Sequence, residues 1–342
     1  MKYVSKLLYY PKIRRISFEK LLNFYTLKKE YRQKKLILNS YPYIAIIDPT
    51  NVCNLKCPLC PTGQGKQTKK GYMKVDLFKK IITELSPYLF EVWLFNWGEP
   101  FLNPDIFELI KISNKSNIST TISTNLNYFP EGHEIKLVKS GLERLIVSFD
   151  GVSQESYSTY RKGGKVDQVI ANVKRIVDAK RKTGNTLPFI KLQFLVNRFN
   201  ENEINLAKKL AESLKVDIEF KTFMFNAKNE NLRNKWQPRN IKFIRYDSKT
   251  GNDLNCKKYR CDWLWLYAVV NWDSTVTPCC NWMENGMFEF GDLKTNTFKE
   301  IWNNEYFISA RKAINKVSCL PMTACHICLG LPPSIDEESI VT

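Results

Sequence analysis

Histidine and long apolar runs are both scarce in this sequence. Only His133 and His326 occur among 342 residues. A zinc site with several histidines, or a catalytic triad that depends on histidine, therefore has few candidate residues. No stretch approaches the roughly 20 uninterrupted apolar residues of a membrane-spanning helix. The first residues also lack a compact apolar segment followed by a small-residue cleavage site. We therefore expect a cytoplasmic protein whose chemistry belongs to a cofactor.

Acidic residues are outnumbered, with 34 Asp and Glu against 52 Lys and Arg, for a formal net charge of +18. About half of the surplus lies in residues 1–35, where eleven basic residues alternate with apolar ones. One interpretation is a basic amphipathic helix that contacts an anionic membrane surface or an acidic partner, with the protein peripheral at the membrane. The other is an extension packed against the catalytic domain with a solvated basic face. No base-reading motif accompanies the charge, so we expect no specific nucleic-acid partner.

Cysteine is abundant, with ten residues that fall into two groups. Without a secretion signal the compartment is reducing, and clustered cysteines there bind metal or do chemistry more often than they form disulfides. Three of them lie between residues 53 and 60, and seven between residues 256 and 328. The spacing favours two metal sites.

Short β-branched runs alternate with helical patterns from residue 44 onward, which is typical of βαβ units around a parallel sheet. The predicted strands are Ile44–Asp48, Val92–Asn96, Ser119–Ser123, Arg144–Phe149, Phe189–Val196 and Asp217–Phe223. The predicted helices are Asp76–Leu85, Pro104–Lys115, Glu134–Ser140, Val166–Lys182 and Glu201–Leu214. Six such steps predict an α/β fold, a partial (β/α)6 barrel of parallel strands, with its site at the carboxyl ends of the strands.

The chain divides into five segments on composition. Residues 1–40 form the basic amphipathic extension, 41–227 the partial barrel, and 228–255 a polar bridge. Residues 256–332 are rich in tryptophan and cysteine, and they predict a small domain organised by metal rather than by a large core. Residues 333–342 form a short acidic tail.

The first cysteine group reads C-x3-C-x2-C directly after the first predicted strand. Cys53, Cys57 and Cys60 are spaced to bind three irons of a [4Fe–4S] cluster and to leave the fourth iron without a protein ligand. A structural zinc site would want a fourth Cys or His nearby, and none lies within this loop. An open iron is therefore the expected feature.

This loop resembles that of the radical S-adenosylmethionine (SAM) superfamily. The resemblance implies that S-adenosylmethionine chelates the open iron and is cleaved reductively to a 5′-deoxyadenosyl radical, which abstracts hydrogen from a substrate. It also implies an electron donor such as flavodoxin or ferredoxin. One departure is Leu59, where the superfamily usually has an aromatic residue beside the adenine.

Further positions match the superfamily at the ends of later strands. Gly98, Glu99 and Pro100 resemble its Gly-Glu-Pro element, which implies that Glu99 binds the methionyl amino group. The same resemblance directs four polar residues toward the ribose and the methionyl carboxylate: Ser123, Asn125, Ser148 and Asp150. Each alone is equally a turn or helix-cap residue. Arg161 is a candidate catalytic residue that holds an acidic group, with a solvated basic loop as the alternative.

The second cysteine group is similar to the SPASM/twitch extension, which carries auxiliary iron–sulfur clusters. The resemblance implies one auxiliary [4Fe–4S] cluster, hence two clusters in all, with four ligands: Cys261, Cys279, Cys325 and Cys328. Cys280 is the alternative ligand beside Cys279. Cys256 and Cys319 are spare thiols or serve a further cluster, and a zinc ribbon is the structural alternative.

A fully ligated auxiliary cluster favours electron transfer, so we expect a two-electron oxidation of a sugar- or aminocyclitol-like small molecule or of a peptide side chain. One alternative is redox-neutral epimerisation, which would need a hydrogen donor such as the candidate catalytic residue Cys280. Another is formation of a peptide thioether by a maturase. A hypothesis of a different class is a zinc-organised binding module. Substrate-facing candidates are Arg161, Gln193, Glu219 and Lys221.

Overall fold

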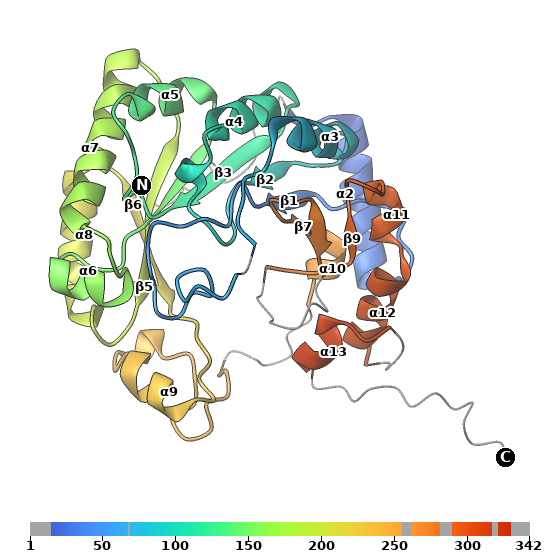
Figure 1. Cartoon of the computed structure of the whole chain (residues 1–342). Coiled ribbons are helices and arrows are strands. Elements are labelled where there is room, and N and C mark those ends of the chain that lie inside the picture. The colour runs from blue at the N-terminus through green and yellow to red at the C-terminus, as the bar shows by residue number, and fades with distance from the viewer. Residues whose placement is uncertain (1–14, 68, 255–260, 281–288, 317–320, 330–342) are drawn as a thin grey trace.

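One continuous sheet runs through the protein. The computed structural model describes residues 15–67, 69–254, 261–280, 289–316 and 321–329 (Figure 1). The strand order within this part of the chain is β6-β5-β4-β3-β2-β1-β7-β8-β9. The strands are β1 Ile44–Ile47, β2 Glu91–Trp93, β3 Ser119–Thr124, β4 Arg144–Ser148, β5 Phe189–Val196, β6 Asp217–Thr222, β7 Tyr267–Val270, β8 Thr275–Thr277 and β9 Gly291–Asp292.

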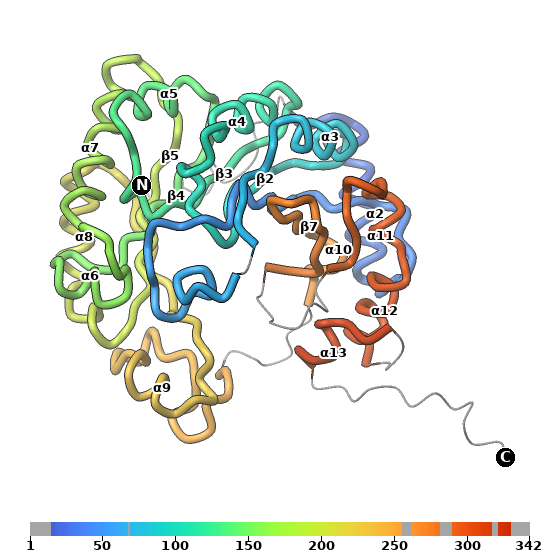
Figure 2. The backbone as a smooth tube through the Cα atoms, viewed as in Figure 1, coloured from blue at the N-terminus to red at the C-terminus, as the bar shows by residue number. Residues whose placement is uncertain are grey.

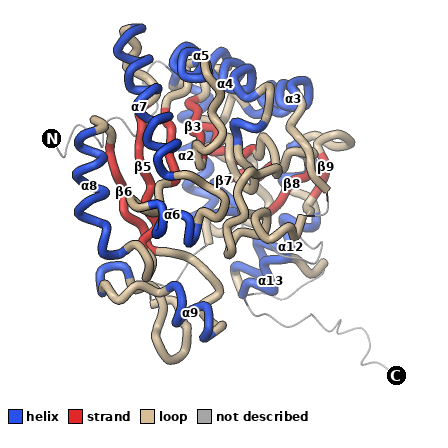
Figure 3. Tube along the Cα trace, turned by 60° about the vertical axis from the view of Figure 1, so that its left-hand side comes forward, coloured by secondary structure: helices blue, strands red, loops and turns tan. Residues whose placement is uncertain are grey.

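The six strands β1 to β6 pair in parallel with their sequence neighbours, which confirms the predicted partial barrel. The helices of the barrel lie on its outer side (Figure 1), and Figure 3 shows α8 beside β6 at one end of the sheet. They are α3 Val75–Leu85, α4 Ile106–Lys115, α5 His133–Ser140, α6 Gln154–Tyr160, α7 Val166–Thr183 and α8 Ile204–Ser213. Short 3-10 turns are η2 Pro100–Leu102, η3 Glu201–Glu203 and η4 Ile241–Phe243.

Strand β5 shows which side of the sheet faces the helices. Ile190, Leu192, Phe194 and Val196 are buried in the core, while the alternating residues between them are half-buried. Successive side chains of a strand point to opposite faces, so these alternating residues line the inner face of the barrel. Polar side chains therefore have access to the barrel interior from β5.

The C-terminal strands extend the barrel sheet instead of forming a separate body. Strand β7 pairs in parallel with β1, with Ile44 opposite Tyr267, and the amide of Asp48 donates to the Val270 carbonyl at 2.8 Å. Strands β8 and β9 then add in antiparallel fashion. The large aromatic residues Trp265 and Trp302 belong to the same apolar core as the barrel strands. This segment therefore shares the barrel core, whereas the sequence suggested organisation by metal in place of a large core.

The remaining helices come before β1 or after β6 in the chain. They are α2 Phe18–Arg32, α9 Glu230–Trp236, α10 Trp263–Leu266, α11 Phe298–Trp302, α12 Glu305–Ile314 and α13 Ala324–Leu329. Figure 2 traces these helices along the chain, and α2 contacts α10, where the ring centroids of Tyr31 and Trp265 lie 5.7 Å apart. The indole of Trp265 donates to the Lys35 carbonyl at 2.9 Å, and that of Trp302 donates to the Ser40 carbonyl at 3.0 Å. Among the described helices, none has the length and apolarity needed to cross a membrane.

Candidate functional site

The loop after β1 brings three thiols to the carboxyl ends of the strands. Cys57 is buried, and Cys53 and Cys60 are half-buried. The amide of Cys60 donates to the Cys57 carbonyl at 3.2 Å, which folds the loop back on itself. Burial, and then the nearby charges of Glu99, Cys57 and Cys60, raise the pKa of Cys53 to about 12. The three sulfurs are thus close enough to repel as thiolates, and a bound metal would relieve that repulsion.

A cavity of about 160 Å³ opens beside these thiols. Its lining comes from the loop after β1 and from the ends of β2, β3 and β4, as predicted for a barrel of parallel strands. The candidates that line it are Cys53, Cys57, Cys60, Gly98, Glu99, Ser123, Asn125, Ser148 and Arg161. Pro100 is buried at the first position of η2, and Asp150 lies behind Arg161; neither belongs to the cavity lining.

Glu99 is the buried carboxyl group of this cavity, with 1% of its surface exposed. Thr124 Oγ1 donates to Glu99 Oε1 at 2.6 Å, and the amide of Asn125 donates to Oε2 at 2.7 Å. Burial raises the pKa of Glu99 to about 7, although these two hydrogen bonds act in the opposite direction. The amide of Phe101 also donates to Oε1 at 3.3 Å, so Oε2, which accepts one hydrogen bond, is the oxygen with capacity for another.

Gly98 explains how this carboxyl reaches the cysteine loop. A Cβ atom at residue 98 would collide with the backbone carbonyl oxygens of Thr50 and Val52. The amide of Glu99 donates to that same Val52 carbonyl at 2.8 Å. Gly98 therefore permits this close approach of the two loops, because only a residue without Cβ fits.

Arg161 reaches the cysteine loop from the end of α6. Its Nε donates to Asp150 Oδ2 at 2.6 Å, and its Nη1 lies 4.0 Å from Cys57 Sγ. The other carboxylate oxygen of Asp150 accepts from the Leu195 amide at 2.8 Å. Asp150 therefore acts on the cavity through Arg161, a relationship that strand-end position alone does not reveal.

Asp48 was missed by the sequence analysis. It follows β1 directly and is 1% exposed, and neither carboxyl oxygen has a partner that meets hydrogen-bond geometry, although the amides of Trp97, Thr50 and Gly98 approach it. Burial raises its pKa, and the charge of Asp273 in the β7–β8 turn adds to that effect. Asp48 thus lies where the cysteine loop, the Gly98 loop and the C-terminal hairpin meet. The sequence signal is an acid between a buried strand and a cysteine motif.

Four cysteines of the C-terminal region come together around α13. Burial raises the pKa of Cys325, and the nearby charges of Cys279, Cys261 and Cys328 add to it. The charge of Cys328 likewise raises the pKa of Cys261, after the larger effect of burial. The pKa of Cys280 is raised by burial alone, without a contribution from another thiol. The thiols that converge are those predicted as one ligand set, whereas Cys256 and Cys319 lie outside the described residues.

Neither thiol group has the compact geometry of a single-ion site. Among the described residues, no three Cys, His, Asp or Glu side chains lie close enough to hold one metal ion. Thiolates that each bind a different iron of a cluster stand further apart than ligands that share one ion. The donor set of both groups, cysteine thiols alone, is the one that iron–sulfur clusters use.

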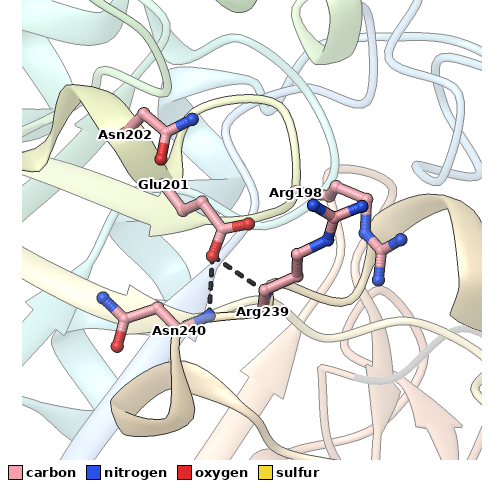
Figure 4. A pocket seen from close by; sticks show the side chains of 5 residues that line it. All are labelled: Arg198, Glu201, Asn202, Arg239 and Asn240. Atoms are coloured by element: carbon pink, nitrogen blue, oxygen red, sulfur yellow. Dashed lines mark hydrogen bonds between the residues drawn. The ribbon is translucent and has the colours of Figure 1, made fainter.

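A second hollow lies outside this site, beside η3 and the segment after α9. Arg198, Glu201, Asn202, Arg239 and Asn240 line it, as Figure 4 shows. Glu201 Oε2 accepts from the amides of Arg239 and Asn240 at 2.8 and 2.7 Å. The hollow shares no lining residue with the thiol cavity. The hydrogen bonds of Glu201 join η3 to the segment after α9, so Glu201 has a structural role.

Comparisons with known proteins agree with this geometry. The radical SAM superfamily model matches residues 47–193, and that of an iron–sulfur cluster-binding domain, SPASM, matches residues 261–329. The AdoMet-dependent heme synthase of Methanosarcina barkeri is 25% identical over 180 residues, which cover 52% of this chain and only 50% of that protein. A Pyrococcus furiosus protein that modifies the cofactor of tungsten-containing aldehyde ferredoxin oxidoreductase is 22% identical over 301 residues, or 78% of this chain and 82% of the relative.

Solved structures share the fold at low identity. SuiB of Streptococcus suis, bound to S-adenosylmethionine, superposes with a TM-score of 0.62 at 15% identity, over 85% of this chain and 72% of SuiB. The enzyme anSMEcpe with bound AdoMet gives 0.56 at 16% identity, over 77% and 81% of the two chains.

Fold and site together define a partial-barrel enzyme built around iron–sulfur clusters. The chain belongs to the radical SAM superfamily and has a C-terminal SPASM iron–sulfur domain. Its cofactors are the radical SAM cluster, S-adenosylmethionine and an auxiliary iron–sulfur cluster.

Proposed function

We propose that this enzyme removes two electrons from a small polyhydroxylated substrate, such as a sugar or aminocyclitol. The observation that carries the proposal is the convergence of Cys261, Cys279, Cys325 and Cys328. Four thiolates saturate a cluster and leave no iron for the substrate, which suits electron transfer. When bound, the cofactors supply a hydrogen-abstracting radical and an acceptor for the electron that the substrate then loses.

Different residues of the thiol cavity bind the cluster and the parts of S-adenosylmethionine. Cys53, Cys57 and Cys60 bind the radical SAM cluster. Glu99 accepts from the methionyl amino group, and Gly98 and Pro100 set the backbone that carries it. Ser123, Asn125 and Ser148 reach toward the ribose and the methionyl carboxylate. Arg161, held by Asp150, offers its guanidinium to an acidic group of the cofactor or the substrate.

The substrate lies against the inner face of the barrel beyond this cavity. Lys191 Nζ is 3.3 Å from Glu219 Oε2 on the neighbouring strand, and Lys221 is 3.6 Å from the same oxygen. Gln193 lies on the same inner face of β5. This wall supplies donors and a carboxylate that suit hydroxyl groups, and Glu219 accepts the proton that leaves with the second electron.

Aromatic residues of β2 and the loop that follows it form the complementary wall. The rings of Trp93 and Phe95 stack with centroids 5.8 Å apart and planes 10° apart, and Phe95 lines the thiol cavity. Tyr267 of β7 continues this wall, with its ring centroid 6.1 Å from that of Trp93. An apolar ring face opposite polar side chains suits the flat face of a sugar ring.

A peptide side chain is the second candidate substrate. Two of the similar structures hold peptides, namely SuiB with its precursor peptide SuiA and anSMEcpe with the Kp18Cys peptide, at TM-scores of 0.62 and 0.54. The fold thus admits a peptide in those proteins. Oxidation, epimerisation and thioether formation then differ in their products: loss of two hydrogens, an isomer of unchanged mass, or a new carbon–sulfur bond.

The decisive experiment is anaerobic reconstitution of the full chain followed by reductive cleavage of S-adenosylmethionine. We expect about eight irons per chain and formation of 5′-deoxyadenosine, measured by mass spectrometry. A candidate substrate deuterated at the reacting carbon should transfer deuterium into 5′-deoxyadenosine, and its product should lack two hydrogens. Continued cleavage by a variant with Cys53, Cys57 and Cys60 replaced by Ala would refute the proposal. A colourless, air-stable protein that contains zinc would favour the binding-module hypothesis instead.

A further inference from the structure

Four apolar side chains of helix α2 lie on its outer face. Phe18, Leu21, Leu22 and Tyr25 are exposed over 76, 51, 55 and 71% of their surfaces. Their spacing of three, four and seven residues places them on one stripe of the helix. We call these four residues the α2 patch. Single exposed apolar residues are common in proteins, but a contiguous stripe marks a contact surface.

The inner face of α2 contributes Leu27 to the apolar core, and it also buries three polar side chains. Lys20, Asn23 and Glu30 are 3, 8 and 1% exposed. Lys20 Nζ donates to the Asn117 carbonyl at 2.7 Å, and the Ser40 hydroxyl donates to Glu30 Oε2 at 2.6 Å. Asn23 exchanges two hydrogen bonds with the backbone of Tyr41, at 2.9 and 2.8 Å. These bonds fix the rotation of the helix, so the α2 patch cannot turn inward.

The patch lies at the edge of the barrel opposite the thiol cavity. Arg15, just before α2, donates to the Ile118 carbonyl at 2.7 Å and lies 2.8 Å from Glu143. These partners come directly before β3 and β4, whereas Ser123 and Ser148 line the cavity from the other ends of the same strands. A partner on the α2 patch would therefore leave the cavity open.

Basic residues lie next to the α2 patch on the exposed face of the helix. Lys29 and Arg32 follow Tyr25 at four and seven residues and are exposed, as are Lys34 and Lys35 just after the helix. Glu19 is the exposed acidic residue of this helix, because Glu30 is buried. A second copy of this chain would bring like charges together, since the net charge is +18. An anionic surface is complementary to both the apolar stripe and the cations.

We infer that the α2 patch and its flanking cations dock this protein on the surface of an anionic lipid bilayer. Aromatic and aliphatic side chains of such a helix enter the boundary between headgroups and acyl chains. Lys29, Arg32, Lys34 and Lys35 are attracted by the negative surface potential. The edge of the barrel formed by the amino ends of its strands then faces the membrane, and the thiol cavity faces the aqueous phase. This inference is independent of the proposed reaction.

The test is co-sedimentation of the full-length reconstituted enzyme with vesicles. Vesicles of phosphatidylcholine with one-quarter phosphatidylglycerol should bind it, and pure phosphatidylcholine vesicles should bind it at least about tenfold more weakly. Replacement of all four patch residues by Gln (F18Q, L21Q, L22Q, Y25Q) should lower binding by about tenfold or more. The double variant K29E/R32E should lower it as well, and added salt should weaken the binding of the wild type.

The matched control replaces exposed apolar residues elsewhere, Leu206 and Ile241, which are 55 and 83% exposed. The double variant L206Q/I241Q should bind vesicles as the wild type does, and every variant should keep its iron content and its cleavage of S-adenosylmethionine. Equal vesicle binding by the wild type and the four-residue patch variant would overturn the inference. The inference would also be overturned if the wild type were a dimer and the patch variant a monomer, because a second copy would then cover the patch. The same holds if the protein bound vesicles only after removal of residues 1–14.

Discussion

Arg161 and Asp150 form a buried ion pair that links β5 to the cysteine loop. Their closest atoms, Nε and Oδ2, are 2.6 Å apart, and the side chains are 14 and 0% exposed. On one side Asp150 is held by the Leu195 amide, and on the other Arg161 approaches Cys57 Sγ. The pair therefore places a cation beside Cys57, and the charge of Arg161 offsets part of the rise in the pKa of this thiol that burial causes.

Substitution of Asp150 by Asn tests this pair. The Asn oxygen can still accept from Leu195, so the change removes the charge and keeps the backbone anchor. An uncompensated buried Arg161 should lower the free energy of unfolding by about 3 kcal/mol or more. Urea unfolding under anaerobic conditions measures that loss, and reconstitution should give less iron than in the wild type.

The matched control is Glu134→Gln at the Arg175–Glu134 pair, whose side chains are 32 and 17% exposed. A more solvated pair contributes little, so this variant should lose about 1 kcal/mol or less. If D150N and E134Q were equally stable, the buried pair would not have the role assigned to it.

Adjacent cysteines give a sharp test of the auxiliary site. Cys279 contributes to the charge environment of Cys325, and Cys280, one residue later, does not. C279A should therefore reduce the iron of the reconstituted protein from about eight to about four per chain. C280A should retain about eight irons. Iron and sulfide analysis with Mössbauer spectroscopy distinguishes them, and the reverse outcome would make Cys280 the ligand.

The barrel itself could be predicted from the sequence because each strand and helix has a local signature. β5 matches its predicted range of Phe189–Val196, and the other barrel strands begin or end within two residues of theirs. The parallel pairing of β7 with β1 could not be predicted in this way. Tyr267–Val270 is a run of four residues that is buried on both faces, and its partner lies more than 200 residues earlier.

The site was predictable where residue type and spacing specify the chemistry, as for Cys53, Cys57 and Cys60. It was not predictable where two side chains meet across the fold. Asp150 follows a strand in the sequence pattern, but its partner is Arg161, directly after α6. The exposure of Phe18 and the burial of Lys20 likewise depend on hydrogen bonds to distant backbone carbonyls.

Gly98 should tolerate no side chain. In G98A the new methyl group collides with the carbonyl oxygens of Thr50 and Val52, so the cysteine loop and Glu99 must separate. We expect loss of most S-adenosylmethionine binding and a lower iron content, measured by equilibrium dialysis and iron analysis. The control is G184A, where the φ of +66° strains alanine but no atom lies within 4 Å. That variant should lose about 1 kcal/mol of stability and keep its iron; equal damage in both would contradict the packing argument.

Lys20 predicts a dependence of stability on pH. Burial, and then the charge of Arg15, lowers the pKa of Lys20 from 10.5 to about 8. Between these values the unfolded chain binds the proton and the folded protein has released it, so the free energy of unfolding rises with pH across this range. The gain is complete above pH 10.5 and is lost as pH falls through 8. Lys20→Met removes this titration, so the stability difference between the wild type and K20M should shift in favour of the wild type from pH 8 to 10.

Thermal unfolding of both proteins across this pH range measures the shift. K29M is the matched control, because Lys29 lies on the exposed face of the same helix. It should keep the pH dependence of the wild type. Parallel profiles for the wild type and K20M would show that Lys20 is solvated in solution, which would contradict its burial on the inner face of α2.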